Sequence, residues 1–216
     1  MFRLLVGLVG VTSVIVAAAL LFGGGSLLWV DTTLTDADGY VNTVPMEVEV
    51  DGYALVAGPA EINIEPELPI DVGELATIRF RAENQSPSQG IFIGVAESVA
   101  LDGYLGGATY AVIEDLGEDS FALSYRTSTT GEIPLSPTAV DIWVTSTHGV
   151  GEQVLEWEIV SGDFSFVVMN EAATDELLFE IVVGARVPLV RPISVSLLVG
   201  GGLVLSLGTI LLALAL

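Results

Sequence analysis

The sequence predicts a mainly β protein, in which a β-sandwich of jelly-roll type lies between two transmembrane α-helices. Both ends of the 216-residue chain are apolar runs with no charge in their middle. The segment between them alternates apolar and polar residues and is interrupted by Gly, Pro and Asp turns. We therefore divide the chain into a first span at 1–28, an acidic domain at 29–187 and a second span at 188–216.

The first apolar run covers residues 4–22 behind Arg3 and continues through three glycines to Trp29. A bilayer core of about 30 Å needs about 20 apolar helical residues, which this run supplies. Its short basic leader resembles an export signal, but the run is longer than the apolar core of a signal peptide. We interpret it as an uncleaved span with Trp29 at the headgroup level.

The second apolar run, residues 193–216, contains no charge. Arg3 favours a cytoplasmic N-terminus, whereas Arg186 and Arg191 precede the second span and oppose that orientation. We predict both termini in the cytoplasm and the domain outside it, because the first run resembles an export signal. With this topology we expect no cytoplasmic domain.

Small residues recur in both spans at a spacing of four, which places each pair on one helix face and allows close backbone approach. We expect these faces to pack the two spans as a hairpin or to pack onto a partner. Mere tolerance of small residues in a span is the alternative. The pairs are Ser13 with Ala17, Ser196 with Gly200, and Gly202 with Ser206.

The domain is strongly acidic, since it carries all 28 Asp and Glu and only four Arg, a net charge of −24, and the chain has no Lys. Nucleic acid is excluded as a partner, because its binding relies on Lys and Arg. Salt would screen the self-repulsion, so we hypothesise a salt-rich habitat. The absence of Cys excludes disulfides, thiol nucleophiles and thiolate metal sites.

Strands are predicted wherever apolar and polar residues alternate. Ile78, Phe80 and Ala82 form one such pattern, and residues 155–159 and 164–168 form two more. The last two are joined by Ser161-Gly162-Asp163, which predicts a hairpin. Further strands are predicted at 53–57, 91–96, 109–114, 121–126, 141–146 and 177–185.

One short helix is predicted over residues 98–105, with Ser98 as its N-cap and Gly106-Gly107 as its end. Proline residues predict longer loops near residues 59–69 and 128–137. We expect Tyr104, Tyr110, Trp143 and Trp157 to be core residues rather than platforms for a ligand.

Four segments resemble a family of uncharacterised prokaryotic membrane proteins with this two-span layout. They are Asp38-Gly39-Tyr40, residues 91–95, Gly103-Tyr104-Leu105 and residues 162–170. The resemblance covers most of the chain and implies the architecture, without an activity. Residues 162–170 are also similar to the late strands of jelly-roll domains that resemble galactose-binding modules.

His148, the one histidine of the chain, is a candidate general base in a predicted loop. Ser146 and Asp141 would complete a triad, but no Gly-x-Ser-x-Gly elbow is present. We interpret His148 as a surface loop residue. A histidine-based metal site would need a second histidine.

Acidic clusters suggest a calcium site. Asp36-Ala37-Asp38-Gly39 resembles part of an EF-hand loop, but the ligand positions on either side hold Leu34 and Pro45, so a turn explains it better. A second cluster offers enough oxygens for a loose Ca²⁺ site, the one cofactor for which the sequence offers a candidate. Its members are Glu114, Asp115, Glu118 and Asp119.

Asn84-Gln85-Ser86 is an N-glycosylation sequon, meaningful only if the domain is exported. No pair of carboxylates can be singled out for glycoside hydrolysis among so many acids. The leading hypothesis is a non-enzymatic, membrane-anchored sandwich that binds an envelope component or an adjoining membrane protein. The alternative is a membrane-anchored hydrolase or carbohydrate-binding module on a jelly roll.

Overall fold

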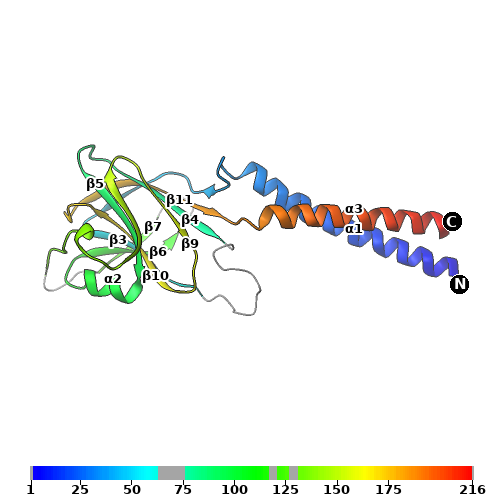
Figure 1. Cartoon of the computed structure of the whole chain (residues 1–216), viewed down its shortest axis with the longest axis horizontal. Coiled ribbons are helices and arrows are strands. Elements are labelled where there is room, and N and C mark those ends of the chain that lie inside the picture. The colour runs from blue at the N-terminus through cyan, green and yellow to red at the C-terminus, as the bar shows by residue number, and fades with distance from the viewer. Residues whose placement is uncertain (1, 63–75, 117–120, 127–130, 216) are drawn as a thin grey trace. The chain divides into compact units, whose positions relative to one another are not determined.

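The protein divides into two compact units in a computed structural model that describes residues 2–62, 76–116, 121–126 and 131–215. The helical unit comprises Met1–Val41 and Val187–Leu216. The β-rich unit comprises Asn42–Arg186. Predicted helical ends and a predicted β-rich middle are therefore both present (Figure 1).

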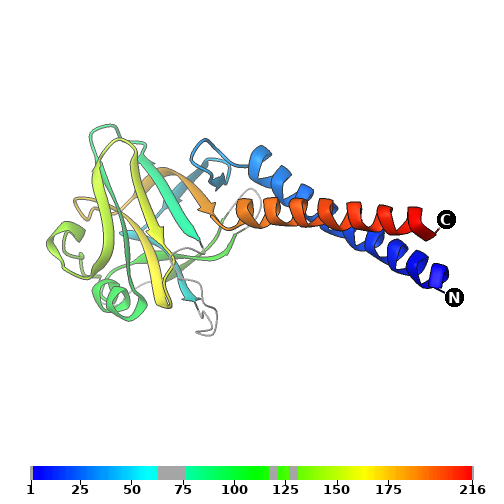
Figure 2. The ribbon, with the colours of Figure 1, turned by 45° about the vertical axis from the view of Figure 1, so that its right-hand side comes forward.

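The helical unit consists of α1 (Phe2–Thr33) and α3 (Val190–Ala215), which lie side by side in both ribbon views (Figures 1 and 2). Both helices are long and apolar enough to cross a membrane. Helix α1 continues beyond Trp29 and includes Asp31 before it ends. No Pro interrupts the mostly apolar sequence of α1, which allows the helix to continue over this length.

Small residues spaced seven apart form the contact between the two helices. A Cβ atom on Gly24 would lie 2.9 Å from Leu197 Cβ, and one on Gly201 would lie 2.9 Å from Leu21 Cγ. Real Cβ atoms do not approach other atoms so closely, and therefore only glycine lets the backbones meet there. The buried residues are Gly10, Ala17 and Gly24 of α1 and Ser194, Gly201 and Gly208 of α3.

The β-rich unit contains two sheets. Sheet A has the order β1-β11-β4-β9, with β2 also paired to β11, and sheet B has the order β7-β6-β3-β10-β5-β8. Strand β3 runs parallel to β6. Antiparallel pairs are formed by β11 with β2 and β4, by β4 with β9, by β10 with β3 and β5, by β5 with β8, and by β6 with β7. The strands are β1 (Val41–Asn42), β2 (Met46–Val50), β3 (Ala54–Ile62), β4 (Thr77–Asn84), β5 (Gly90–Glu97), β6 (Tyr110–Leu116), β7 (Phe121–Arg126), β8 (Trp143–Val150), β9 (Gln153–Glu158), β10 (Gly162–Asn170) and β11 (Leu177–Arg186).

The two sheets enclose the main hydrophobic core, as in a sandwich. Phe80 of sheet A and Phe166 of sheet B meet with ring centroids 4.1 Å apart. Trp157 of sheet A lies edge-on to Phe166 at 5.2 Å. Every second residue of a strand points into this core, and the strands were therefore predictable from apolar residues at every second position. The predicted sandwich architecture is confirmed at this level.

Sheet B is also covered on its second face, by α2 (Ser98–Leu105) and by the segment 131–142, which includes a 3₁₀ turn at Pro137–Ala139. Leu101 and Leu105 of α2 are buried against this face, and Trp143 lies 4.8 Å from Phe92. The central strands β5 and β10 are consequently buried on both sides.

The predicted hairpin of residues 155–168 is wrong. Strand β9 pairs with β4 in sheet A, whereas β10 pairs with β3 and β5 in sheet B. The connection at residues 159–161 therefore crosses from one sheet to the other. Both strands alternate correctly because both bury one face in the same core, and a local pattern does not reveal which neighbour each strand pairs with.

The predicted helix over residues 98–105 is confirmed, but its predicted cap is wrong. Glu97 occupies the N-cap position without a side-chain capping bond, and Ser98 is the first helical residue. The Ser98 hydroxyl forms a hydrogen bond with the Ser165 hydroxyl at 2.9 Å instead. Strand β2, with its alternating Met46–Val50 sequence, is an element that our sequence analysis missed.

Candidate functional site

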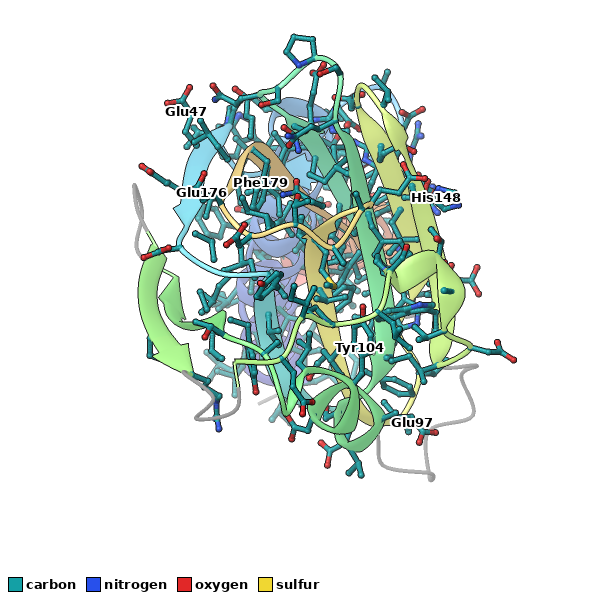
Figure 3. All side chains as sticks on the ribbon, turned by 90° about the vertical axis from the view of Figure 1, so that its left-hand side faces the viewer. Glu47, Glu97, Tyr104, His148, Glu176 and Phe179 are labelled. Carbon is teal, nitrogen blue, oxygen red and sulfur yellow. The ribbon has the colours of Figure 1, made fainter. Side chains whose placement is uncertain are left out.

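An open hollow of about 710 Å³ lies at one end of the β-rich unit, where β2 ends and β11 begins. A second hollow of about 340 Å³ adjoins it and shares Gln89 and Thr174 with the first. We call this part of the surface the loop end, because the connections 85–89 and 171–176 form it (Figure 3). The first hollow is lined by Glu49, Val50, Asp51, Ser86, Gln89, Thr174, Asp175, Glu176, Leu177 and Leu178.

The connection 171–176 has an unusual backbone. Ala173 and Glu176 have positive φ angles of 53° and 60°, a region that residues other than Gly rarely adopt. Ala173 is buried, whereas Glu176 is exposed at the rim of the hollow. The surrounding contacts therefore have to hold this turn in place.

A buried pair of amides supplies much of that support. Asn84 Nδ2 donates a hydrogen bond of 2.8 Å to Asn170 Oδ1. Asn170 Nδ2 in turn donates to the Thr174 carbonyl at 3.2 Å, and Asn84 Oδ1 accepts from the Ser86 backbone N–H. The pair thus joins both connections of the loop end from inside the domain.

Glu171 holds the other side of the turn. Its backbone N–H donates to the Gly90 carbonyl at 2.9 Å, and its carbonyl accepts from the Ser136 hydroxyl at 3.0 Å. Its carboxylate lies 3.1 Å from His148 Nδ1. A Cβ on Gly90 would clash with the Glu171 carboxylate, so Gly90 leaves room for the side chain of Glu171 in this position.

The prediction that His148 lies in a loop is wrong, because His148 is inside β8 opposite Phe92 of β5. Its side chain is 49% exposed and its ring stacks on Phe92 at 6.4 Å. It points outward at the edge of the domain (Figure 3). A contact with Glu171 as exposed as this one contributes at most about 1 kcal/mol to stability.

The carboxylates of the first hollow offer oxygen ligands but are spread around its rim. Within the described residues, no three His, Asp or Glu side chains come close enough together to hold a metal ion. Glu118 and Asp119 of the predicted calcium cluster lie outside the described residues, as do the side chains of Glu114 and Asp115. The described residues therefore do not test the predicted calcium site, which stays a prediction.

The segment with Asp36 forms a turn. Asp36 Oδ1 accepts hydrogen bonds from the backbone N–H groups of Asp38 at 3.0 Å and Tyr40 at 2.9 Å, and Gly39 has a φ of 85°. This is the bonding expected of an Asp-initiated turn that ends in glycine.

Asn84 of the sequon is only 7% exposed, and both of its amide atoms are engaged. A glycan on Asn84 would have to displace the bond to Asn170 and leave the interior. The folded domain therefore does not favour modification at this position.

The four aromatic residues predicted to lie in the core all pack in hydrophobic clusters, and none of them lines the two hollows of the loop end. They are Tyr104, Tyr110, Trp143 and Trp157. Tyr110 and Trp157 are buried, and Trp143 donates from its indole nitrogen to the Pro137 carbonyl at 2.8 Å. Tyr104 donates to the Leu135 carbonyl, and burial raises the pKa of its hydroxyl to about 12.

The predicted small-residue pairs of the helices occupy different surroundings. Ala17 is buried in the contact between α1 and α3, and Ser13 lies beside Gly208. A Cβ on Gly200 or Gly202 would meet no atom within 4 Å. Ser196 and Ser206 are exposed and donate to carbonyls of their own helix.

Five further small residues at this contact were not predicted from the sequence: Gly10, Gly24, Ser194, Gly201 and Gly208. Their signal was a spacing of seven residues, since two helices packed along each other meet every second turn. A search limited to pairs four apart does not detect it.

The fold places the chain in a general class of proteins in which a sandwich-like β domain lies between two apolar terminal helices. No family model matches the chain, and no curated protein matches it. The expected resemblance to a two-span family is therefore supported only for the layout, and nothing identifies a family.

A solved structure described as "Bacillus endospore appendages form a novel family of disulfide-linked pili" is similar to part of the chain. The similarity covers 66% of this chain and 89% of that chain, with 7% sequence identity and a TM-score of 0.24. Values this low carry no argument about fold or function.

Proposed function

We propose that this is an integral membrane protein whose two helices anchor an acidic β-sandwich outside the cytoplasm. The sandwich acts as a non-enzymatic binding module for an envelope component or an adjoining membrane protein. The observation that carries the anchoring is the surface of α1 and α3, which is covered with exposed apolar side chains. Phe2, Leu4, Leu203 and Leu214 are each between 68% and 79% exposed.

Such a surface is unfavourable in water. Burying one Leu or Phe side chain in an apolar environment is favourable by about 1.5–3 kcal/mol, so a bilayer would stabilise the helical unit strongly. The helices also satisfy their own backbone hydrogen bonds, as a lipid environment demands. The tight glycine contacts between α1 and α3 support two spans that pack as a hairpin.

The proposed orientation, with the domain outside the cytoplasm, rests on the resemblance of the first apolar run to an export signal. A domain of net charge −24 is also repelled by the anionic lipids of a cytoplasmic surface. An envelope location and a salt-rich environment are part of this proposal, because salt would screen the repulsion among the carboxylates.

The loop end is the proposed binding surface. It contains the hollows, it has a backbone held in a rarely populated conformation, and it lies at the start of β11. The chain continues from the opposite end of that strand into α3. A strand of this length separates its two ends by about 30 Å, which keeps the loop end distant from the point of attachment.

The alternative proposal is a membrane-anchored hydrolase or carbohydrate-binding module on a jelly roll. The hollow supplies carboxylates, including Glu49 and Asp175, but no described aromatic side chain lines it. A sugar site normally combines both. A jelly-roll topology for the sandwich remains part of this alternative.

The experiment uses the absence of Cys from the chain. A Ser88→Cys variant places one thiol at the loop end, and we expect a membrane-impermeant maleimide to label it in intact cells. Labelling only in inverted vesicles would overturn the orientation, and release of the protein by alkaline carbonate would overturn the anchoring.

Binding is tested with a photo-crosslinking residue at Gln89, compared with the same residue at Glu156, an exposed position on the outer face of β9. We expect Gln89 to yield one repeated adduct in native membranes that Glu156 does not. Identical adducts from both positions would contradict the loop end as the binding surface.

A further inference from the structure

The turn at residues 171–176 depends on contacts with other parts of the domain. Ala173 and Glu176 have positive φ angles of 53° and 60°, which residues other than Gly rarely adopt. Such a backbone is intrinsically unfavourable and persists only where the surrounding structure holds it. The ordered turn therefore competes with a locally opened form, and each contact that holds the turn shifts that equilibrium.

Glu171 is the residue at which three other segments hold the start of this turn. Its backbone N–H donates to the Gly90 carbonyl, and its own carbonyl accepts from the Ser136 hydroxyl. Its carboxylate Oε1 lies 3.1 Å from His148 Nδ1. The first two bonds join neutral groups and do not change near neutral pH, whereas the third bond involves an imidazole.

The strength of this third bond depends on the charge of the imidazole. Histidine side chains change charge between about pH 5 and 8, a range over which carboxylates are mostly ionised. A neutral imidazole donates an ordinary hydrogen bond to a carboxylate, whereas an imidazolium donates a charge-assisted one that is roughly twice as strong. Because His148 is the one histidine of the chain, this bond is the place where a histidine can act on the fold.

The surroundings of His148 direct its charge onto the turn. His148 is fixed in β8, which pairs with β5, and the ring of Phe92 from β5 stacks on it. Its neighbours on the same face of β8 are Ser146 and Val150, which are uncharged. Among the residues that the structure describes, Glu171 carries the charged side chain that contacts His148.

The turn in its ordered form completes the larger hollow of the loop end. It supplies Thr174, Asp175 and Glu176 to the lining. Asp175 and Glu176 are the other charged residues of the turn, and neither is in hydrogen-bond or ion-pair contact with His148. In Figure 3 Glu176 and His148 lie on opposite sides of the loop end, so a contact made at the start of the turn affects the lining at its end.

We propose that His148 and Glu171 form a pH-sensitive clamp, which holds the turn at residues 171–176 more tightly when the imidazole is protonated. The clamp keeps the lining of the larger hollow in place at acidic pH and loosens it as pH rises. This inference concerns the β-rich unit alone, and it depends neither on the membrane anchoring nor on what the loop end binds.

Hydrogen exchange of the full-length protein in nonionic detergent measures how often the turn opens. The reporters are the backbone N–H groups of Glu171 and Ala173, which donate to the Gly90 and Asn170 carbonyls. Their protection is compared with that in the His148→Gln variant, which cannot be protonated. The comparison is made at each pH separately, so that effects of pH on the whole acidic domain cancel.

We expect the protection of the reporters, relative to His148→Gln, to be about threefold higher at about pH 5.5 than at about pH 8. A contact as exposed as this one limits the change to about fivefold. Equal ratios at the two pH values would overturn the clamp, and so would a higher ratio at pH 8.

Glu171→Gln removes the charge from the other partner and keeps a side chain of similar size. In this variant the imidazolium faces a neutral amide, so we expect the gain in protection at acidic pH to shrink. An undiminished gain would show that His148 acts through another group and would overturn the assigned pair.

Ile159 provides the control within the same molecule. Its backbone N–H donates to the Ala76 carbonyl, outside the turn. Its protection should be the same in the unchanged protein and in both variants at a given pH. A parallel loss at Ile159 would show that the substitutions lower the stability of the whole domain, and it would overturn a local clamp.

Discussion

Asn84 and Asn170 show how single residues determine the shape of the loop end. Asn84 donates one hydrogen bond to Asn170 inside the domain, and each of the two amides also bonds a backbone group of one connection. The sequence marks Asn84 only as part of a sequon and gives no sign of Asn170. Their burial and mutual bond come from strands that are far apart in the chain.

Replacing one member of this pair should cost more stability than its single hydrogen bond is worth. Asn84→Ala leaves the Asn170 amide buried without that partner, which costs about 1–3 kcal/mol of unfolding free energy. Urea unfolding measures the cost, with Gln85→Ala as the exposed control, which should change stability by less than about 0.5 kcal/mol. Equal effects of the two substitutions would contradict a supporting role for the pair.

Tyr104 gives the domain a predicted alkaline limit. Burial raises the pKa of its hydroxyl to about 12, above the value of about 10 in the unfolded chain. Between these values the unfolded state loses the proton first, so unfolding becomes more favourable as pH rises. This contribution to stability is present below pH 10 and is lost as pH rises toward 12.

Urea unfolding at successive pH values tests the effect. Tyr104→Phe should lower stability at neutral pH, because the bond to the Leu135 carbonyl is lost, and should flatten the decline above pH 10. An unchanged decline in this variant would assign the alkaline loss to other groups. Tyr110, whose pKa is also raised by burial and by the charge of Asp102, would then be the next candidate.

At the scale of elements, strand positions were largely predictable, whereas strand partners were not. Alternation predicted β9 and β10, because in both strands every second residue points into the core between the two sheets. It did not show that they belong to different sheets, which depends on contacts with β4, β3 and β5. The same limitation applies to His148, which is part of β8 because of its pairing with β5.

The helix pair offers a direct test at this scale. A Cβ on Gly208 would lie 3.0 Å from Ser13 Cβ, about 0.5 Å short of the smallest Cβ–Cβ separation in a disulfide, so a small outward shift of one helix brings the pair into range. The double variant Ser13→Cys/Gly208→Cys should therefore form an internal disulfide under mild oxidation. It is detected as a mobility shift that a reductant reverses.

Gly202 provides the matched control, because a Cβ there meets no atom within 4 Å. The double variant Ser13→Cys/Gly202→Cys should remain reduced within one molecule. Equal internal crosslinking of both pairs would show that α1 and α3 do not keep the register seen here.

At the scale of the whole molecule, charge and hydropathy divide the chain into two environments. Asp31, Asp36 and Asp38 belong to the helical unit, and all of the other acids lie within Asn42–Arg186. Both helices are uncharged in their middle. The helices of the helical unit are long and apolar enough to cross a membrane, and counterions would screen the repulsion among the acids of the β-rich unit.

Salt should accordingly stabilise the full-length protein. Raising KCl from 0.1 to 1 M shortens the Debye length from about 10 Å to 3 Å and removes most of the self-repulsion. We expect the melting temperature of the domain in nonionic detergent to rise by at least about 4 °C. Sucrose of equal osmolality is the control, and a melting temperature insensitive to KCl would contradict a charge-limited stability.

Local composition was enough to predict two apolar helices, an acidic β-rich middle and most of the strand positions. Periodicity and hydropathy report which environment each residue meets, and they do so without knowledge of its neighbours. The pairing of the strands, the contact between the glycines of α1 and α3, and the bond between Asn84 and Asn170 are known only from the folded structure. Those contacts join residues that are distant in the chain, and local patterns carry no information about such pairs.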